Sequence, residues 1–364
     1  MRVGMAMRWA ALGSAGTLVA ALAALCLGSG CSSVGYYAQS VGGHLDLLQR
    51  ARPVADWLAD PATPPALQAR LQVAQQARRF AVTELGLPDN ASYTRHAELG
   101  RDAAVWNVVA APALSLTLKT WCYPVMGCVG YRGYYDRAAA EAEGAALRAQ
   151  GWEVSVYGVP AYSTLGWTNW LGGDPLLNTV VGGSEAFMVR LIFHELAHQM
   201  VYLAGDTMFN ESYATAVERL GLARWQAVTG RSLDDPAAAQ RAADFRAITR
   251  RTRTALDTLY RSSLDDAAKH ARKAGILAAM RAEVEALKAQ PGSPWAGFTG
   301  YDGWLARANN ASLALQAAYD GLVPAFERLF HQQGGDFARF HAEVQRLAAL
   351  PADQRRAALD PNQP

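Results

Sequence analysis

The sequence is poor in cysteine and carries almost no net charge. Four of its 364 residues are cysteines, and charged residues make up 18% of the chain against 51% hydrophobic residues. Its two N-terminal arginines precede residue 31, so residues 31–364 hold 32 basic and 32 acidic residues. A neutral chain without a basic cluster gives no electrostatic reason to expect nucleic acid as a partner. It has no internal repeat and no low-complexity tract, and its composition is that of a globular protein.

The N-terminus has the pattern of an export signal. Two arginines precede an uncharged apolar run, residues 9–27, and small residues then lead to Cys31. This resembles a bacterial lipobox, although Gly28 stands where an apolar residue is usual, and we expect residues 1–30 to be a lipoprotein signal peptide and Cys31 to carry the lipid. An uncleaved membrane anchor is the alternative. Both place the chain in the bacterial envelope facing the periplasm, and Ser32 favours the outer membrane.

Two cysteines remain in the mature chain. Cys122 and Cys128 lie in a short segment that also contains Pro124 and Gly127. A disulfide between them is expected in an oxidising compartment. A metal site built on the pair would need further ligands, and the neighbouring sequence offers none. We interpret the pair as structural.

Helical periodicity dominates the chain after Cys31, and the middle holds two strand-like segments. The strand-like segments, 105–118 and 152–162, are short and rich in Val, Leu, Trp and Tyr. The layout predicts an α+β fold that is predominantly helical, with a small mixed sheet in residues 31–230 and a helical region in residues 231–350. The predicted helices are 45–59, 64–85, 134–150, 184–203, 208–220, a hairpin over 235–289, 304–330 and 337–350.

One motif, His194-Glu195-Leu196-Ala197-His198, carries chemistry. Histidines at i and i+4 share one helix face, so both imidazoles can bind one metal ion. Glu195 is rotated by roughly 100° from His194, where it can act as general base on a water instead of binding the metal. The surrounding residues are apolar, which favours a buried metal site over two solvated surface histidines.

The third metal ligand can be placed by helix geometry. If the chain reverses at Gly205, His198 and Glu211 stand side by side, each about 9–10 Å from the turn. Glu211 is therefore the predicted third ligand of a catalytic zinc. Glu218 would lie about 10 Å too far along the helix. Asp206 lies in the turn and is expected to cap the next helix or to contact a histidine from behind.

These residues carry a resemblance. His194 to Gln199, Gly205-Asp206 and Phe209-Asn210-Glu211-Ser212 resemble the gluzincin type of HExxH peptidase. The whole chain resembles a bacterial lipoprotein family named putative aminopeptidases. The resemblance implies a zincin-like fold, Zn²⁺ and peptide-bond hydrolysis. The chain lacks the Gly-x-Met-x-Asn string of the best-known gluzincin aminopeptidases, so endo- and exo-cleavage both stay open. The family resemblance rests on Gly30-Cys31, Tyr36-Tyr37, the stretches 127–133 and 161–167, and Asn309-Asn310-Ala311.

The sequence thus predicts a zinc peptidase that acts on peptides or proteins in the envelope. In zincins a strand beside the active helix binds extended substrate, and residues 154–162 are the candidate. Tyr162 at its end is either an oxyanion donor or a core residue. Asn309 and Asn310 are interpreted as a helix cap, with substrate contact as the alternative. The rival function is a non-catalytic zincin-fold lipoprotein that scaffolds or binds, and hydrolysis of non-peptide substrates is a third. The oligomeric state is not indicated.

Overall fold

The computed structural model describes residues 31–123, 127–161, 163–166 and 169–359. The predicted signal peptide and Tyr162 lie outside these residues. The chain divides into two compact units, residues 1–49 and 50–364. The described part of the first unit is helix α2 (Cys31–Arg50). Among the described helices, none is long and apolar enough to cross a membrane.

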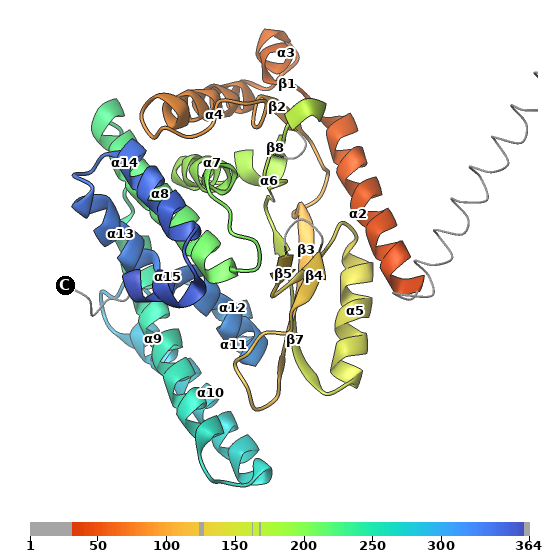
Figure 1. Cartoon of the computed structure of the whole chain (residues 1–364), viewed down its shortest axis with the longest axis vertical. Helices are drawn as coiled ribbons and strands as arrows, with labels where there is room; N and C mark the ends of the chain where they lie inside the picture. The colour runs from red at the N-terminus through yellow and green to blue at the C-terminus, as the bar shows by residue number, and fades with distance from the viewer. Residues whose placement is uncertain (1–30, 124–126, 162, 167–168, 360–364) are drawn as a thin grey trace, which may run out of the picture. The chain divides into compact units, whose positions relative to one another are not determined.

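The second unit is predominantly helical, with three small sheets (Figure 1). Its α+β character agrees with the predicted fold class. The sheets are β1-β2-β8, β6-β3-β7 and the pair β4-β5. The strands are β1 (Arg52–Pro53), β2 (Arg95–Ala97), β3 (Val105–Pro112), β4 (Trp121–Tyr123), β5 (Gly127–Val129), β6 (Arg132–Tyr134), β7 (Trp152–Val159) and β8 (Leu176–Leu177). The helices are α3 (Val54–Ala59), α4 (Pro65–Thr83), α5 (Arg137–Ala149), α6 (Asn178–Val181), α7 (Glu185–Met200), α8 (Thr207–Thr229), α9 (Pro236–Arg261), α10 (Asp266–Ala289), α11 (Asp302–Arg307), α12 (Asn310–Asp320), α13 (Val323–Gln332), α14 (Phe337–Ala348) and α15 (Ala352–Ala358), with a 3-10 turn, η1, at Asn169–Leu171.

The central sheet contains both predicted strands. β3 and β7 pair antiparallel from Val105 opposite Val159 to Pro112 opposite Trp152. Each ends at or before a proline, Pro112 and Pro160, which explains why both are shorter than predicted: proline offers no N–H to the ladder. Helices α5 and α12 pack against these two strands and lie on either side of them (Figure 1).

Helix α7, which contains the histidine motif, packs with α4 and α8. Phe193 of α7 stacks on Phe80 of α4 with ring centroids 6.0 Å apart. Phe80 in turn packs edge-on against Trp225 of α8 at 5.1 Å. All three side chains are buried. The motif helix is therefore held by large aromatic contacts on its apolar face, which keeps its polar face in a fixed direction.

The predicted end of α8, the helix that follows the histidine motif helix, was wrong. The helix does not stop before Gly221 but runs to Thr229 and closes at Gly230, which has φ of 67°. Gly221 lies inside the helix instead. A Cβ on Gly221 would lie 2.8 Å from atoms of Leu85 and Phe193. The glycine is thus explained by the close approach of α8 to α7 and not by helix termination.

Two other predicted helices are interrupted. The predicted helix 45–59 breaks at β1, where Pro53 lacks the N–H that a continuous helix requires. The predicted helix 304–330 is divided into α11, α12 and α13. Asn309 begins α12 as its N-cap and forms a capping box with Ser312, which confirms the predicted cap.

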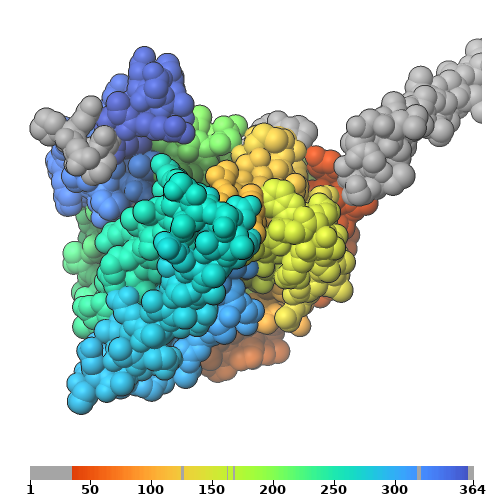
Figure 2. All heavy atoms as spheres, turned by 90° about the horizontal axis from the view of Figure 1, so that it is seen from below, coloured from red at the N-terminus to blue at the C-terminus, as the bar shows by residue number. Residues whose placement is uncertain are grey.

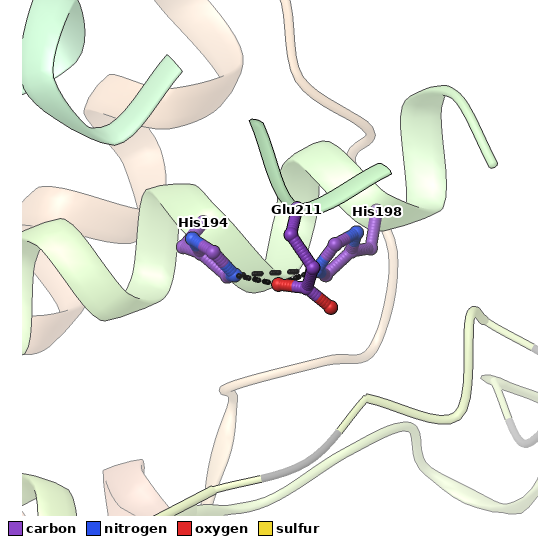
Figure 3. Close-up of side chains that lie close together, drawn as sticks. All are labelled: His194, His198 and Glu211. Atoms are coloured by element: carbon purple, nitrogen blue, oxygen red, sulfur yellow. Dashed lines mark hydrogen bonds and ion pairs between the residues drawn. The ribbon is translucent and has the colours of Figure 1, made fainter. Parts of the chain in front are cut away.

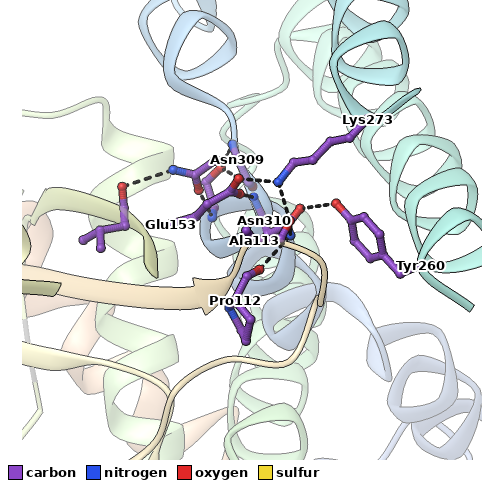
Figure 4. A network of polar contacts seen from close by, with 9 residues as sticks. Pro112, Ala113, Glu153, Tyr260, Lys273, Asn309 and Asn310 are labelled. Carbon is purple, nitrogen blue, oxygen red and sulfur yellow. Dashed lines mark hydrogen bonds and ion pairs between the residues drawn. The ribbon is translucent and has the colours of Figure 1, made fainter. Parts of the chain in front are cut away.

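The predicted helical hairpin is confirmed as α9 and α10. Figure 2 shows it spread over one face of this unit beside α5. A buried polar network joins the hairpin and α12 to the end of β3 (Figure 4). Asn310 donates to the carbonyls of Pro112 and Ala113, at 2.9 Å each, and accepts from Tyr260 of α9 at 2.7 Å. Lys273 of α10 is paired with Glu153 of β7 and donates to the Ala113 carbonyl at 2.8 Å.

Candidate metal centre

The structure brings His194, His198 and Glu211 together (Figure 3). The two Nε2 atoms lie 3.2 Å apart. Oε2 of Glu211 lies 3.3 Å from Nε2 of His194 and 3.6 Å from Nε2 of His198. Within the described part of the chain, these residues form the group of His, Cys, Asp and Glu side chains suited to holding a metal ion. Three lone-pair-bearing atoms from two antiparallel helices thus converge on one point.

The spacing of these atoms fits a tetrahedral metal ion. Zinc binds histidine nitrogen and carboxylate oxygen at about 2.0–2.2 Å, and the corners of such a tetrahedron are about 3.3–3.6 Å apart. The observed separations of 3.2, 3.3 and 3.6 Å are close to this range. Three protein ligands leave the fourth corner for water or substrate, which is the coordination of catalytic zinc. The donor set therefore fits the predicted metal.

Glu218 contacts the candidate ligand His194 on the side of the imidazole ring away from Glu211. Its Oε2 accepts a hydrogen bond from Nδ1 of His194 at 3.1 Å, and its Oε1 accepts from Arg190 at 2.8 Å. A carboxylate on Nδ1 favours the tautomer with its proton on that atom, which leaves Nε2 free to bind a metal ion once Nε2 has lost its own proton. Glu218 was not among the predicted ligands, and its contact with His194 was not predicted either. Because α8 runs antiparallel to α7, the two turns beyond Glu211 bring Glu218 level with His194 and Arg190.

The turn between α7 and α8 fixes the position of Glu211. Asn210, which is buried, donates to the Leu203 carbonyl and accepts from the Leu203 N–H, both at 2.8 Å. Asp206 caps α8 by accepting from Phe209 N at 3.1 Å, and it also binds Arg355 at 3.0 Å. Of the two predicted roles for Asp206, the structure shows the helix cap.

The hairpin of β4 and β5 lies against this same turn. Cys122 and Cys128, which are opposite each other in the hairpin, are joined by a disulfide. Gly127 packs so close to the turn that a Cβ there would lie 2.7 Å from the backbone nitrogen of Gly205. Its φ of 72° also favours glycine. The disulfide-closed hairpin therefore packs against the turn that leads into α8, the helix of Glu211.

The pKa values of Glu195 and Glu211 are shifted in opposite directions. Burial raises the pKa of Glu195, and the nearby histidines only partly offset this. Burial also acts to raise the pKa of Glu211, but the charges and hydrogen bonds of His198 and His194 outweigh it and lower that pKa to about 2. Burial acts to lower the pKa of His194, yet its contacts with Glu211 and Glu218 hold it well above the ordinary value. Glu211 is thus a permanent anion, whereas Glu195 binds a proton more readily.

Tyrosines that the sequence argument missed surround the centre. Tyr131 interacts electrostatically with both Glu211 and Glu195, and burial raises its pKa well above the ordinary value. Tyr157 and Tyr202 each interact with Glu211. No local spacing could have related Tyr131 to the motif, but it lies in the stretch 127–133 that carried the family resemblance. The predicted oxyanion donor, Tyr162, lies outside the described residues.

A hydrogen-bonded chain links α7 to the loop before β8 on the Glu195 side of the centre. Gln199, next to His198, accepts from Asn90 at 2.7 Å and donates to Ser92 Oγ at 3.2 Å. That hydroxyl accepts from the backbone N–H of Asp174, also at 3.2 Å. Asp174 is buried, and its charge contributes to raising the pKa of Glu195. Sequence reasoning gave no role to this aspartate.

Comparison with known proteins gives the family. The family model described as "Putative aminopeptidase" matches residues 35–359, which is most of the chain. Searches of the curated proteins and of the solved structures returned no match. The matched region includes α7, α8, the central sheet and the helical hairpin. The chain therefore belongs to the Putative aminopeptidase family.

Proposed function

We propose that the protein is a zinc-dependent aminopeptidase of the HExxH type with a zincin-like fold. The observation that carries this proposal is the convergence of His194, His198 and Glu211 at the separations of a tetrahedral zinc site, with Glu195 beside it. A purely structural zinc site is closed by four protein ligands, whereas this group offers three. That difference favours the enzyme over a scaffold that retains the same fold.

The residues divide the work of peptide hydrolysis. A zinc ion at this site supplies Lewis acidity for the scissile carbonyl and acidifies a water molecule. Glu195 accepts the proton of the attacking water and passes it to the leaving amine, a role that its raised pKa suits. Glu218 and Arg190 hold His194 in the required tautomer. Tyr131 is a candidate to donate a hydrogen bond to the developing oxyanion. Tyr162, which lies outside the described residues, is a second candidate.

The substrate proposed is a peptide with a free N-terminus. Asp174 is a buried carboxylate whose charge acts on Glu195, so it is suited to bind an α-ammonium group next to the general base. The peptide would extend along β7, which occupies an edge of the β6-β3-β7 sheet among the described strands. An edge strand offers main-chain groups for pairing with an extended peptide.

The proposed location is the bacterial envelope, with the chain anchored by a lipid on Cys31. The sequence pattern of residues 1–31 supports export and lipidation. The disulfide between Cys122 and Cys128 supports an oxidising compartment.

The direct test compares peptide substrates that differ only at their N-terminus. Zinc-loaded protein is incubated with a peptide library in free and N-acetylated forms, and the products are identified by mass spectrometry. We expect stepwise release of N-terminal residues from the free peptides and no release from the acetylated ones. Internal cleavage of both forms would replace the aminopeptidase with an endopeptidase. Zinc-loaded protein that cleaves neither form would favour the scaffold.

A further inference from the structure

Helix α2 presents an apolar surface to solvent. Tyr37, Val41 and Leu45 are 45%, 59% and 44% exposed, and they follow one another at intervals of four residues. Such spacing places them on consecutive turns of one side of the helix, over about 12 Å. Ala38 and Gly42 are also exposed on this side. From Gly35 to Leu45 the exposed side thus bears no charged side chain and no polar group besides the Tyr37 hydroxyl.

Between Gly35 and Leu45, the polar residues of α2 other than Tyr37 occupy the less exposed side. Gln39, Ser40 and His44 are all half-buried. Gln39 donates to Ser40 at 2.9 Å, and Ser40 donates to the Tyr36 carbonyl at 2.9 Å, so these groups are used locally. A helix that faces water normally has its polar residues outside and its apolar residues inside. Between Gly35 and Leu45 the pattern is the reverse, which indicates that this part of the exposed side contacts something other than water. Beyond Leu45 the order is the usual one, with Leu47 and Leu48 buried and Asp46, Gln49 and Arg50 exposed.

We infer that the exposed apolar side of α2 lies on the bilayer surface, as an interfacial helix continuous with the lipid anchor. The inference rests on the lipid anchor proposed above. Residues 1–30 are the proposed signal peptide, so the mature chain would begin at Cys31, which is proposed to carry the lipid and is also the first residue of α2. Tyr37 is therefore within about 9 Å of the anchored end along the helix axis.

The composition of this surface suits a bilayer interface. Tyrosine has an apolar ring and a polar hydroxyl, and it is favoured at the level of the lipid headgroups. Valine and leucine on the following turns would reach the boundary of the acyl chains, as in interfacial helices. The first charged side chain on the exposed side is Asp46, one residue after Leu45, and marks the end of the apolar surface. One lipid anchor alone fixes only a point, whereas this second contact would also fix the direction of the helix.

The test places a fluorescent label on each side of α2 in the full, lipidated protein. In the lipidated protein, Val41→Cys puts a single reactive thiol on the apolar side, since the Cys31 sulfur would carry the lipid and Cys122 and Cys128 are bonded to each other. Gln39→Cys is the matched control, two residues away and roughly 160° around the helix. Both proteins are reconstituted into phosphatidylethanolamine–phosphatidylglycerol vesicles, with and without nitroxide-labelled lipid. We expect the nitroxide to remove more than half of the emission at position 41 and to leave position 39 nearly unchanged.

The other outcomes are distinguishable. A protein that floats with vesicles but shows equal emission at both positions would overturn the interfacial helix and leave the lipid anchor intact. An N-terminal peptide that carries no lipid, from protein that does not float, would overturn the anchor and the inference together. Excimer formation by pyrene at position 41 in the absence of vesicles would assign this surface to a second copy of the chain, and would likewise overturn the inference.

Discussion

Two groups of buried polar residues in the second unit differ in how their hydrogen bonds are balanced. In the network of Figure 4, the ammonium group of Lys273 faces a carboxylate and a carbonyl, and the amide of Asn310 uses both its donors and its acceptor. In the group of Figure 3, a carboxylate oxygen and two ring nitrogens converge, and all three are acceptors when both histidines are neutral and carry their proton on Nδ1.

The difference shows how a structural network can be told from a binding site. Buried polar atoms are costly unless donors and acceptors match, and the network around Lys273 matches them internally. In that tautomer, the three atoms around Glu211 match only if a cation or added protons lie among them. Both groups are buried and polar, so these properties alone do not distinguish them. The balance of hydrogen-bond donors and acceptors within each group does.

The largest effect is predicted for replacing Glu195, the proposed general base. Glu195→Gln should lower kcat/KM by about 10²–10⁴-fold, because it removes the general base. Zinc content and thermal stability should stay as in the wild type, as measured by elemental analysis and thermal unfolding. A variant that retains most of its activity would contradict the role given to Glu195.

Breaking the network around Lys273 should lower the free energy of unfolding without affecting zinc binding. Lys273→Met leaves the carboxylate of Glu153 without its cation and should cost about 2–3 kcal/mol in the free energy of unfolding, below the value for a fully buried pair because Glu153 is a quarter exposed. Urea denaturation gives the cost. Lys288→Met is the matched control, since its partners Glu285 and Asp302 are more exposed, and it should cost about 1 kcal/mol or less. Loss of zinc from Lys273→Met would show that the two groups are not independent.

A smaller effect is expected for Glu218, which contacts the proposed ligand His194. Glu218→Gln removes the negative charge next to Nδ1 of His194 and should weaken zinc binding by about 10–100-fold without abolishing it. Competition with a chromophoric chelator measures the affinity. Glu185→Gln is the control, because Glu185 pairs with Arg231 at the other end of α7 and does not touch the histidines. Equal affinities in the two variants would remove Glu218 from the metal centre.

The predicted pH dependence has opposite signs with and without zinc. The pKa of His194 is raised in the metal-free fold, so its contribution to stability is present below pH 6.5 and is lost as the pH rises through the raised value. Zinc must displace that proton, and its affinity should therefore rise up to about tenfold per pH unit over the same range. Thermal unfolding of zinc-loaded and chelator-treated protein from pH 6 to 9 measures both. Two parallel pH profiles would show that His194 is not a ligand.

The sequence predicted the local parts of the centre better than the distant ones. The pair His194 and His198 follows from helix periodicity, and Glu211 follows from one turn and the rise per residue. Glu218 was excluded as a ligand by the same arithmetic, but its contact with Nδ1 depends on how α8 rotates against α7. Tyr131 lies between β5 and β6, Asp174 lies in the loop before β8, and no spacing rule relates either position to the motif.

Similar limits explain the fold prediction. Caps such as Ser184, which accepts from Phe187 N, and Asn309 are visible in the sequence because they act on the next turn. Gly221 was misread because a helix-ending glycine and a glycine at a close helix contact look alike in a sequence. Only the distance to Phe193 separates the two.

The central claim is that the atoms gathered around Glu211 hold zinc, and elemental analysis tests it most directly. Purified wild-type protein, Glu211→Ala and the control Glu153→Gln are each exposed to excess zinc, desalted and measured, with circular dichroism to verify folding. We predict about one zinc per chain in the wild type and in Glu153→Gln, and almost none in Glu211→Ala. A folded wild-type protein without zinc, or a Glu211→Ala protein that retains it fully, would contradict the account.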